Sequence, residues 1–214
     1  DGKMKYKDGR EYDGEMLFGK PHGDGKMKYK DGGEYDGKWC AGERHGKGKM
    51  KYNDGREYVG EWAANKMHGK GKYTWPDRGV YVGEFVEGTM HRKGKYTWAK
   101  GKEYIGEFAE GKQHGAGTET SMWNVYRYQG RWIYGKRHGK GVLAWFGDFM
   151  EWEVEFENGQ LVDVFTVKFA SLKRLFVEVI ILNHLWKHRF GLVYVLIYVC
   201  VGFGVGSWVV ELVM

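Results

Sequence analysis

Proline and cysteine are scarce in this chain, whose 214 residues include two of each. The shortage of proline, together with the lack of a three-residue period, excludes a collagen-like triple helix. Cys40 and Cys200 lie too far apart in the sequence to indicate a disulfide scaffold. Stability must therefore come from packed side chains and backbone hydrogen bonds.

Glycine and aromatic residues are abundant instead: there are 35 glycines, and aromatics make up 17% of the chain. Glycine at this level argues against a mainly helical protein, because each interior glycine costs a helix about 1 kcal/mol. A chain with this many aromatic rings is not disordered. Only four glycines follow position 160, namely Gly191, Gly202, Gly204 and Gly206, so we expect two structurally different parts.

A repeated phrase occupies the first three quarters of the chain, which indicates a repeat architecture. It reads Tyr-x-Gly-x-aromatic, then Gly-x-x-His-Gly-x-Gly, then a short run and a turn, and successive copies are 23, 23, 23, 23 and 24 residues apart. The anchoring tyrosines are Tyr12, Tyr35, Tyr58, Tyr81, Tyr104 and Tyr128. A degenerate seventh copy begins at Trp152, as expected of a terminal repeat that caps a stack. The chain opens on half a copy, so we expect its native start to lie upstream.

Each copy predicts one antiparallel β-hairpin. Within it, apolar residues alternate with charged ones, which is the period of a strand. Asp8-Gly9, Asp31-Gly32 and Asp54-Gly55 are typical hairpin turns. A glycine between the two aromatic positions leaves room for a ring to lie across the strand. Stacked hairpins would form an elongated sheet with one aromatic face and one charged face.

The phrase YxGxWxxGxxHGxGxxxxxDG resembles the MORN (membrane occupation and recognition nexus) repeat over about residues 2–160. The chain departs from it at Asn65, at Arg92 and at an inserted residue before Tyr128. The resemblance implies a mainly β fold, a single-layer antiparallel sheet of consecutive hairpins over residues 1–160. Proteins with such arrays include junctophilin-like membrane tethers, lipid kinases, histone methyltransferases and cytoskeletal scaffolds, so a protein-binding or lipid-binding role is expected.

The aromatic face is the predicted surface for protein contact, because exposed rings dominate interface energetics. Its candidate residues are Tyr35, Trp39, Tyr58, Trp62, Tyr81, Phe85, Tyr104, Phe108, Tyr128 and Trp132.

The lysines of the opposite face form a second candidate surface, for anionic lipid headgroups. These are Lys26, Lys28, Lys30, Lys49 and Lys51 in the repeats, with Lys187 and Arg189 further along the chain. Carboxylates on the partner strands of the same face, such as Glu34 and Glu57, offer the alternative that this surface neutralises itself through cross-strand pairs.

Several chemistries are not expected. The histidine of each repeat, such as His45 or His68, lies roughly 10 Å from its neighbours in adjacent hairpins, which is too far for shared zinc ligation. We therefore expect the histidines to bond backbone between hairpins. Lysines and rings on opposite faces do not suit a nucleic-acid platform, and no helix follows the Gly-x-Gly pairs to complete a nucleotide site. The sequence thus predicts no enzyme, no cofactor and no metal.

The C-terminal part changes period. Phe165, Phe169, Leu172, Phe176 and Val179 follow a helical stripe, which predicts an amphipathic helix within residues 161–189 that lies on a surface.

Residues 190–210 contain no charge, and 21 helical residues span about 31 Å, the thickness of a bilayer core. The sequence thus predicts a transmembrane helix with the repeats on the cytoplasmic side, since basic residues precede it. Gly202 and Gly206 could seat a second helix. A buried core helix is the alternative.

The combined prediction is a non-catalytic, membrane-anchored scaffold, junctophilin-like in layout. Two alternatives remain: an accessory subunit of a large respiratory or photosynthetic membrane complex, and an anionic-phospholipid-binding module.

Overall fold

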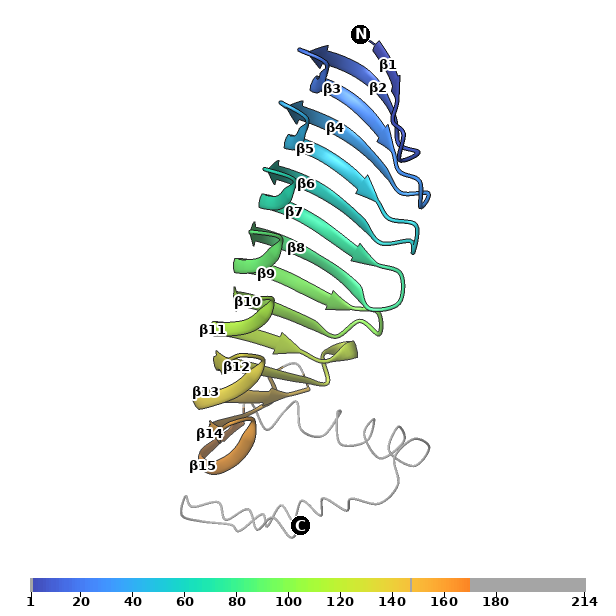
Figure 1. Ribbon diagram of the computed structural model, residues 1–214. Helices are drawn as coiled ribbons and strands as arrows, with labels where there is room; N and C mark the ends of the chain where they lie inside the picture. Colours follow the sequence, from blue (N-terminus) through green and yellow to red (C-terminus); the bar gives the residue numbers. More distant parts are fainter. Residues whose placement is uncertain (1, 147, 170–214) are drawn as a thin grey trace, which may run out of the picture. The chain divides into compact units, whose positions relative to one another are not determined.

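The computed structural model describes residues 2–146 and 148–169, which belong to a different structural unit from residues 171–214. These described residues form one open antiparallel sheet of 15 strands, in which the order of the strands in space equals their order in the chain (Figure 1). The strands are β1 Gly2–Lys5, β2 Glu11–Leu17, β3 Lys20–Lys28, β4 Glu34–Cys40, β5 Glu43–Lys51, β6 Glu57–Ala63, β7 Lys66–Trp75, β8 Gly79–Val86, β9 Thr89–Trp98, β10 Glu103–Ala109, β11 Lys112–Thr120, β12 Tyr126–Ile133, β13 Lys136–Trp145, β14 Met150–Glu157 and β15 Gln160–Phe169. The predicted hairpin array is confirmed.

Two kinds of turn alternate along the sheet. At the predicted Asp-Gly turns only the glycine has a positive φ, for example 92° at Gly32. At the opposite edge both turn residues have positive φ, for example 52° at Ala41 and 91° at Gly42, as in the two-residue turns that suit the twist of a hairpin. Asn65 takes the glycine position of such a turn with φ 66°, a conformation that asparagine tolerates.

A β-bulge interrupts each of the six hairpins from β2–β3 to β12–β13 at the same place, beside the residue that follows the histidine. In β6–β7, the register shifts between Gly60 and Glu61, and Gly69 has φ 56°. Because a bulge bends its strand and increases its twist, repetition of this bulge gives every hairpin the same bend. Arg92 keeps the bulge with φ 51° although it replaces glycine.

The core is a continuous ladder of rings on one face of the sheet, which we call the ring face. Each tryptophan or phenylalanine after the repeat glycine packs edge-on against the tyrosine of its own repeat and that of the preceding repeat. Trp62, for example, lies 5.1 Å from Tyr58 and 5.4 Å from Tyr35, ring centre to ring centre, with planes 87° apart. This edge-to-face geometry is favoured by the charge distribution of aromatic rings. Packing between repeats is therefore as intimate as packing within one.

Two features at the C-terminal end of the sheet depart from the sequence prediction. Residues 161–169 belong to β15, so the prediction that Phe165 and Phe169 belong to an amphipathic helix is wrong. The cause is the Asn158-Gly159 turn, with φ 52° and 87°, which sends the chain back along β14. In addition, the insertion before Tyr128 forms a short 3₁₀ helix, Met122–Asn124, between β11 and β12.

The predicted membrane-spanning helix at residues 190–210 lies outside the described residues, as does the rest of the predicted amphipathic helix, residues 170–189. Within residues 2–146 and 148–169, no helix has the length and apolar character needed to cross a bilayer.

Candidate binding surfaces

The ten rings predicted for protein contact lie together on the ring face, but they are buried. Their exposed fractions do not exceed 5%, so the prediction that they form an exposed surface is wrong. Period-two alternation identified their common face correctly. It did not reveal that rings of adjacent repeats cover one another.

The repeat glycines explain how the tyrosines become buried. A Cβ placed on Gly71 would lie 2.5 Å from the Tyr58 hydroxyl oxygen and 2.6 Å from its Cζ, so the ring occupies the space that a side chain would need. Gly60, which pairs with Gly71 across the hairpin, is covered by the same ring. The expectation that a ring lies across these glycines is confirmed.

Hydrogen bonds fix the tyrosines at the bulge. The Tyr58 hydroxyl donates to the Glu61 carbonyl at 2.8 Å, and Tyr81 and Tyr104 donate to equivalent carbonyls at 3.0 Å. Burial raises the pKa of the Tyr58, Tyr81 and Tyr104 phenols, which keeps these groups protonated as donors. Tyr128 is the exception, because its buried hydroxyl has no hydrogen-bond partner among the described residues.

This difference makes a matched pair of substitutions informative. Tyr58→Phe removes a bonded hydroxyl and should lower the free energy of unfolding by about 1 kcal/mol. Tyr128→Phe removes an unpaired buried hydroxyl and should leave stability unchanged or raise it. Urea denaturation followed by tryptophan fluorescence measures both, and equal losses in the two variants would contradict the assignment.

Half-buried side chains border the ring ladder on the same face and are the accessible part of it. Met67 and Met90 precede the histidines, while Trp75, Tyr96 and Trp98 end their strands. Trp75 lies 5.5 Å from Tyr96, and Tyr96 lies 4.6 Å from Trp98, ring centre to ring centre. The methionines lie at one edge of the sheet and the aromatic side chains at the other, so the ring ladder has two separate apolar borders where the ten predicted rings present no surface.

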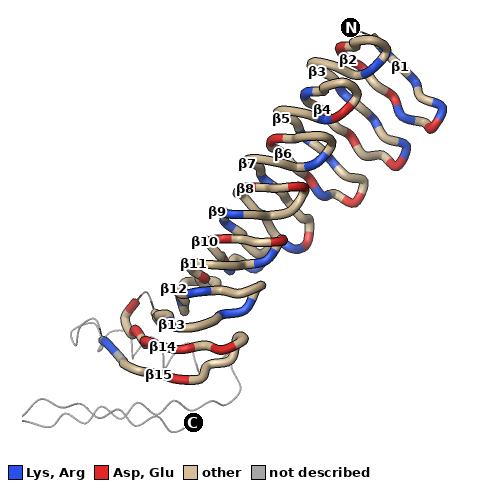
Figure 2. Tube along the Cα trace, turned by 60° about the vertical axis from the view of Figure 1, so that its left-hand side comes forward, with Lys and Arg blue, Asp and Glu red and all other residues tan. Residues whose placement is uncertain are grey.

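The predicted lipid-binding lysines are largely neutralised by neighbours on the opposite face, which we call the lysine face. Lys26 pairs with Asp36 at 3.0 Å, Lys28 with Glu34 at 3.7 Å, and Lys49 with Glu57 at 2.9 Å. Figure 2 shows basic and acidic residues interspersed over these first strands. The cross-strand pairs expected as the alternative are therefore present for three of the five lysines.

Lys30 and Lys51 are exposed and form no ion pair with the described residues. The other candidates of the sequence analysis, Lys187, Arg189, Gly202 and Gly206, lie outside the described residues.

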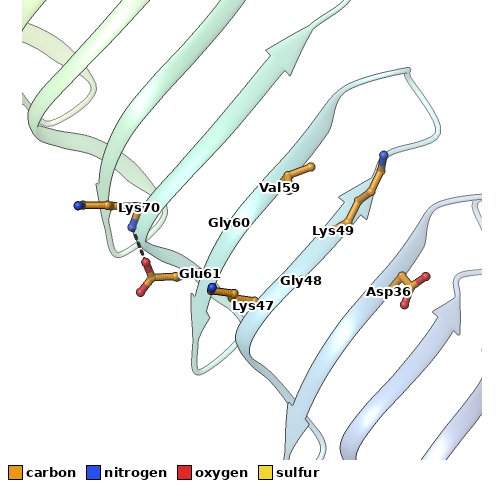
Figure 3. Close-up of a pocket in the computed structure, with 8 residues that line it drawn as sticks. All are labelled: Asp36, Lys47, Gly48, Lys49, Val59, Gly60, Glu61 and Lys70. Carbon is orange, nitrogen blue, oxygen red and sulfur yellow. Dashed lines mark hydrogen bonds between the residues drawn. The ribbon is translucent and has the colours of Figure 1, made fainter.

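The middle of the lysine face carries two shallow hollows that the sequence analysis missed. Each lies over a pair of repeat glycines. The first lies over Gly48 and Gly60 (Figure 3), and the second over Gly71 and Gly83. Lysines and the valines Val59 and Val82 surround them. The available signal was the residue between tyrosine and glycine in each repeat, which is aspartate in the first two copies and valine in the next two.

A buried carboxylate on the ring face also escaped prediction. Glu119 is 4% exposed and lies in register between Tyr104 and Tyr128, where other repeats have methionine, tyrosine or leucine. One carboxylate oxygen accepts a hydrogen bond from Arg137 and the other pairs with Lys102, both at 2.7 Å. Because two cations already compensate the charge of Glu119, this cluster is no site for a metal cation.

The histidines do not act as predicted, with one exception. The His22 Nδ1 accepts a hydrogen bond from the Ala41 amide at 3.5 Å. Elsewhere in the described array the backbone links adjacent hairpins at this edge, as where the Gly88 amide donates to the Met67 carbonyl at 2.9 Å. No group of three or more potential metal ligands occurs among residues 2–146 and 148–169.

Comparison with known proteins agrees with this architecture. No curated protein matches the chain. The MORN repeat family model matches residues 12–34, 35–55, 58–80, 81–103, 104–123 and 128–146, together more than half of the sequence. These six matches coincide with the repeats that build the ring ladder, and the chain belongs to the MORN-repeat family.

Proposed function

We propose that this MORN-repeat protein is a non-catalytic, membrane-anchored scaffold that binds a protein partner on its ring face. The repeats themselves are a non-enzymatic module of a kind that binds proteins or lipids. The observation that carries the proposal is the pair of half-buried borders of the ring ladder, Met67 and Met90 at one edge of the sheet and Trp75, Tyr96 and Trp98 at the other. Methionine and aromatic residues are typical of protein interfaces, because they combine apolar area with adaptable or rigid shape.

Anchoring is assigned to the apolar residues 190–210, whose length suits a bilayer. The described array supports a binding role because it offers a long regular surface. Fifteen strands about 4.8 Å apart give a sheet that extends roughly 65 Å across its strands.

The test is purification of the full chain in mild detergent from its native membrane, followed by identification of the proteins that accompany it. A second preparation carries Met67→Gln and Met90→Gln. Gln113 occupies the equivalent position in another repeat, so the fold accommodates this side chain. We expect the amount of accompanying partner to fall at least about fivefold, because the variants remove apolar contacts from the interface.

Lys100→Gln, in an exposed turn, is the control and should retain the partner. If the variant with Met67→Gln and Met90→Gln also retains the partner, that result would contradict binding on the ring face. Recovery of the chain only in fixed stoichiometry with a large complex would instead identify it as an accessory subunit. Release of the protein from membranes by alkaline carbonate would contradict anchoring by residues 190–210.

A further inference from the structure

A channel crosses the middle of the lysine face, bounded by two rows of outward-pointing side chains. One row contains Lys49 and Val59, the other Lys47, Glu61 and Lys70, and the backbone of the repeat glycines forms the floor between them (Figure 3). The two hollows of this channel have volumes of about 560 and 520 Å³. They share Val59 and Lys70 in their walls, so they are continuous.

The first row changes its chemistry along the array. At the N-terminal end, cross-strand neighbours alternate between lysine and aspartate, as where Asp36 lies between Lys26 and Lys49. From β6 onward, Val59, Val82 and Ile105 replace the aspartate, and Lys72 lies in register between the two valines. The same backbone positions therefore bear a neutral row in one half and a basic, apolar row in the middle.

Several lysines along the channel remain without a counter-charge. Among the described residues, Lys47, Lys70, Lys72 and Lys93 form no ion pair. Three carboxylates also line the hollows, namely Asp36, Glu61 and Glu84, but they are fewer than the five lysines that line them, Lys47, Lys49, Lys70, Lys72 and Lys93. The channel thus has an excess of positive charge.

Apolar surface lies beside this charge. Val59, Val82 and Ile105 are 43%, 51% and 55% exposed. β-branched residues of a sheet usually pack on a half-buried surface, so these three side chains leave apolar area open to a ligand. A ligand that matches the channel therefore has an apolar stripe flanked by acidic groups.

The spacing of the hollows selects the form of that ligand. Equivalent positions of adjacent repeats are two strands apart, about 9.6 Å. Residues seven apart in an α-helix lie on the same side and about 10.5 Å apart along the axis. A helix with one apolar residue per heptad can therefore place successive side chains in successive hollows over two or three repeats.

We propose that the channel over β5–β10 binds an acidic amphipathic α-helix of a protein partner. Apolar side chains of the helix contact Val59, Val82 and Ile105, while its glutamates or aspartates pair with Lys47, Lys70, Lys72 and Lys93. This surface lies on the face opposite to the ring-face interface, so the two interactions are independent.

The array itself supplies the variants for a test. Val82→Asp converts the row Lys72-Val82-Lys95 into the alternation already present in Lys26-Asp36-Lys49, so the fold should be retained. Asp36→Val makes the reverse change and extends the apolar row by one repeat. The probe is a fluorescently labelled four-heptad helix with leucine at its apolar positions and glutamate on both flanks. The full chain is held in mild detergent, and binding is followed by fluorescence anisotropy at low salt.

We expect Val82→Asp to raise the Kd of the acidic helix about tenfold and Asp36→Val to lower it about threefold, because charge and apolar contact change together. The same helix with lysine flanks should not bind. Absence of acidic-helix binding, or equal Kd values for the wild type and Val82→Asp, would overturn the proposal.

Vesicles that contain phosphatidylserine form the second arm, for which the full chain is transferred from detergent into nanodiscs of neutral lipid, because detergent would dissolve the vesicles. Suppose that the vesicles bind the wild-type chain, do not bind the Val82→Asp variant, and outcompete the helix. The ligand is then an anionic lipid surface and the helix proposal is wrong. The variant with Met67→Gln and Met90→Gln should bind the acidic helix with an unchanged Kd. Failure of the helix proposal can thus be distinguished from failure of the proposed partner binding on the ring face.

Discussion

Replacing Gly71 with alanine should be among the most destabilising single substitutions in the sheet. The new Cβ would lie 2.5 Å from the Tyr58 Cε2 and hydroxyl oxygen, so the fully buried ring must move and disturb its edge-on contacts with Trp62 and Phe85. Overpacking of this kind costs about 3 kcal/mol, at the upper end of its usual range. Chemical denaturation of the purified chain measures the loss.

Two controls separate the clash from general effects of losing a glycine. Gly88 is a turn glycine with φ 85° and open space around it. Gly88→Asn introduces asparagine, the residue that already occupies the equivalent turn position at Asn65. It should cost less than about 1 kcal/mol. In a Tyr58→Ala background the clash is absent, so the added cost of Gly71→Ala should shrink strongly. An undiminished cost there would contradict the packing explanation.

Trp62→Ala should lower the free energy of unfolding by about 3 to 5 kcal/mol, as expected for removal of a large buried ring. Trp62 is 4% exposed and contacts the tyrosines of two repeats. Its indole also donates to the Gly48 carbonyl at 3.3 Å and underlies the Arg44 guanidinium at 4.4 Å. The variant therefore weakens packing within the hairpin of Trp62 and also packing between this hairpin and the preceding one.

Trp123→Ala is the matched control, because this tryptophan is 82% exposed in the short 3₁₀ helix. Its effect should stay within about 0.5 kcal/mol. Hydrogen exchange locates the damage of Trp62→Ala: amides of β4 to β7 should lose protection, while those of β12 and β13 should change least. Uniform loss throughout the array would contradict a ladder of neighbouring contacts.

The sequence predicted the hairpins and their order well, because strand alternation, Asp-Gly turns and a 23-residue period are local signals. Burial of Tyr58 and Trp62 was not predictable in the same way, since it depends on rings of neighbouring repeats: Phe85 of the next repeat packs against Tyr58, and Tyr35 of the preceding repeat packs against Trp62. The single-sequence pattern distinguishes the two faces of a strand without stating what covers each face.

The prediction of where the sheet ends at the C-terminal side was wrong for a different reason. Phe165 and Phe169 are four residues apart, a spacing that fits one side of a helix and equally one side of a strand, so the pattern did not distinguish β15 from a helix. The buried Glu119 and the exposed Val59-Lys72-Val82 row were visible only as departures from the repeat consensus. Their roles could be inferred only from the strand register, which shows the residues that lie beside them on neighbouring strands.

The strand order has a mechanical consequence. Within the described array each strand is hydrogen-bonded only to the strands before and after it in the chain, so no long-range pairing fastens one end of the sheet to the other. A pulling force applied at an end would load one strand's hydrogen bonds at a time, as in opening a zipper, and each release would expose the next strand. The sheet would thus lengthen in small steps at low force, and a repeat still folded in the middle would keep its surfaces intact while its neighbours open.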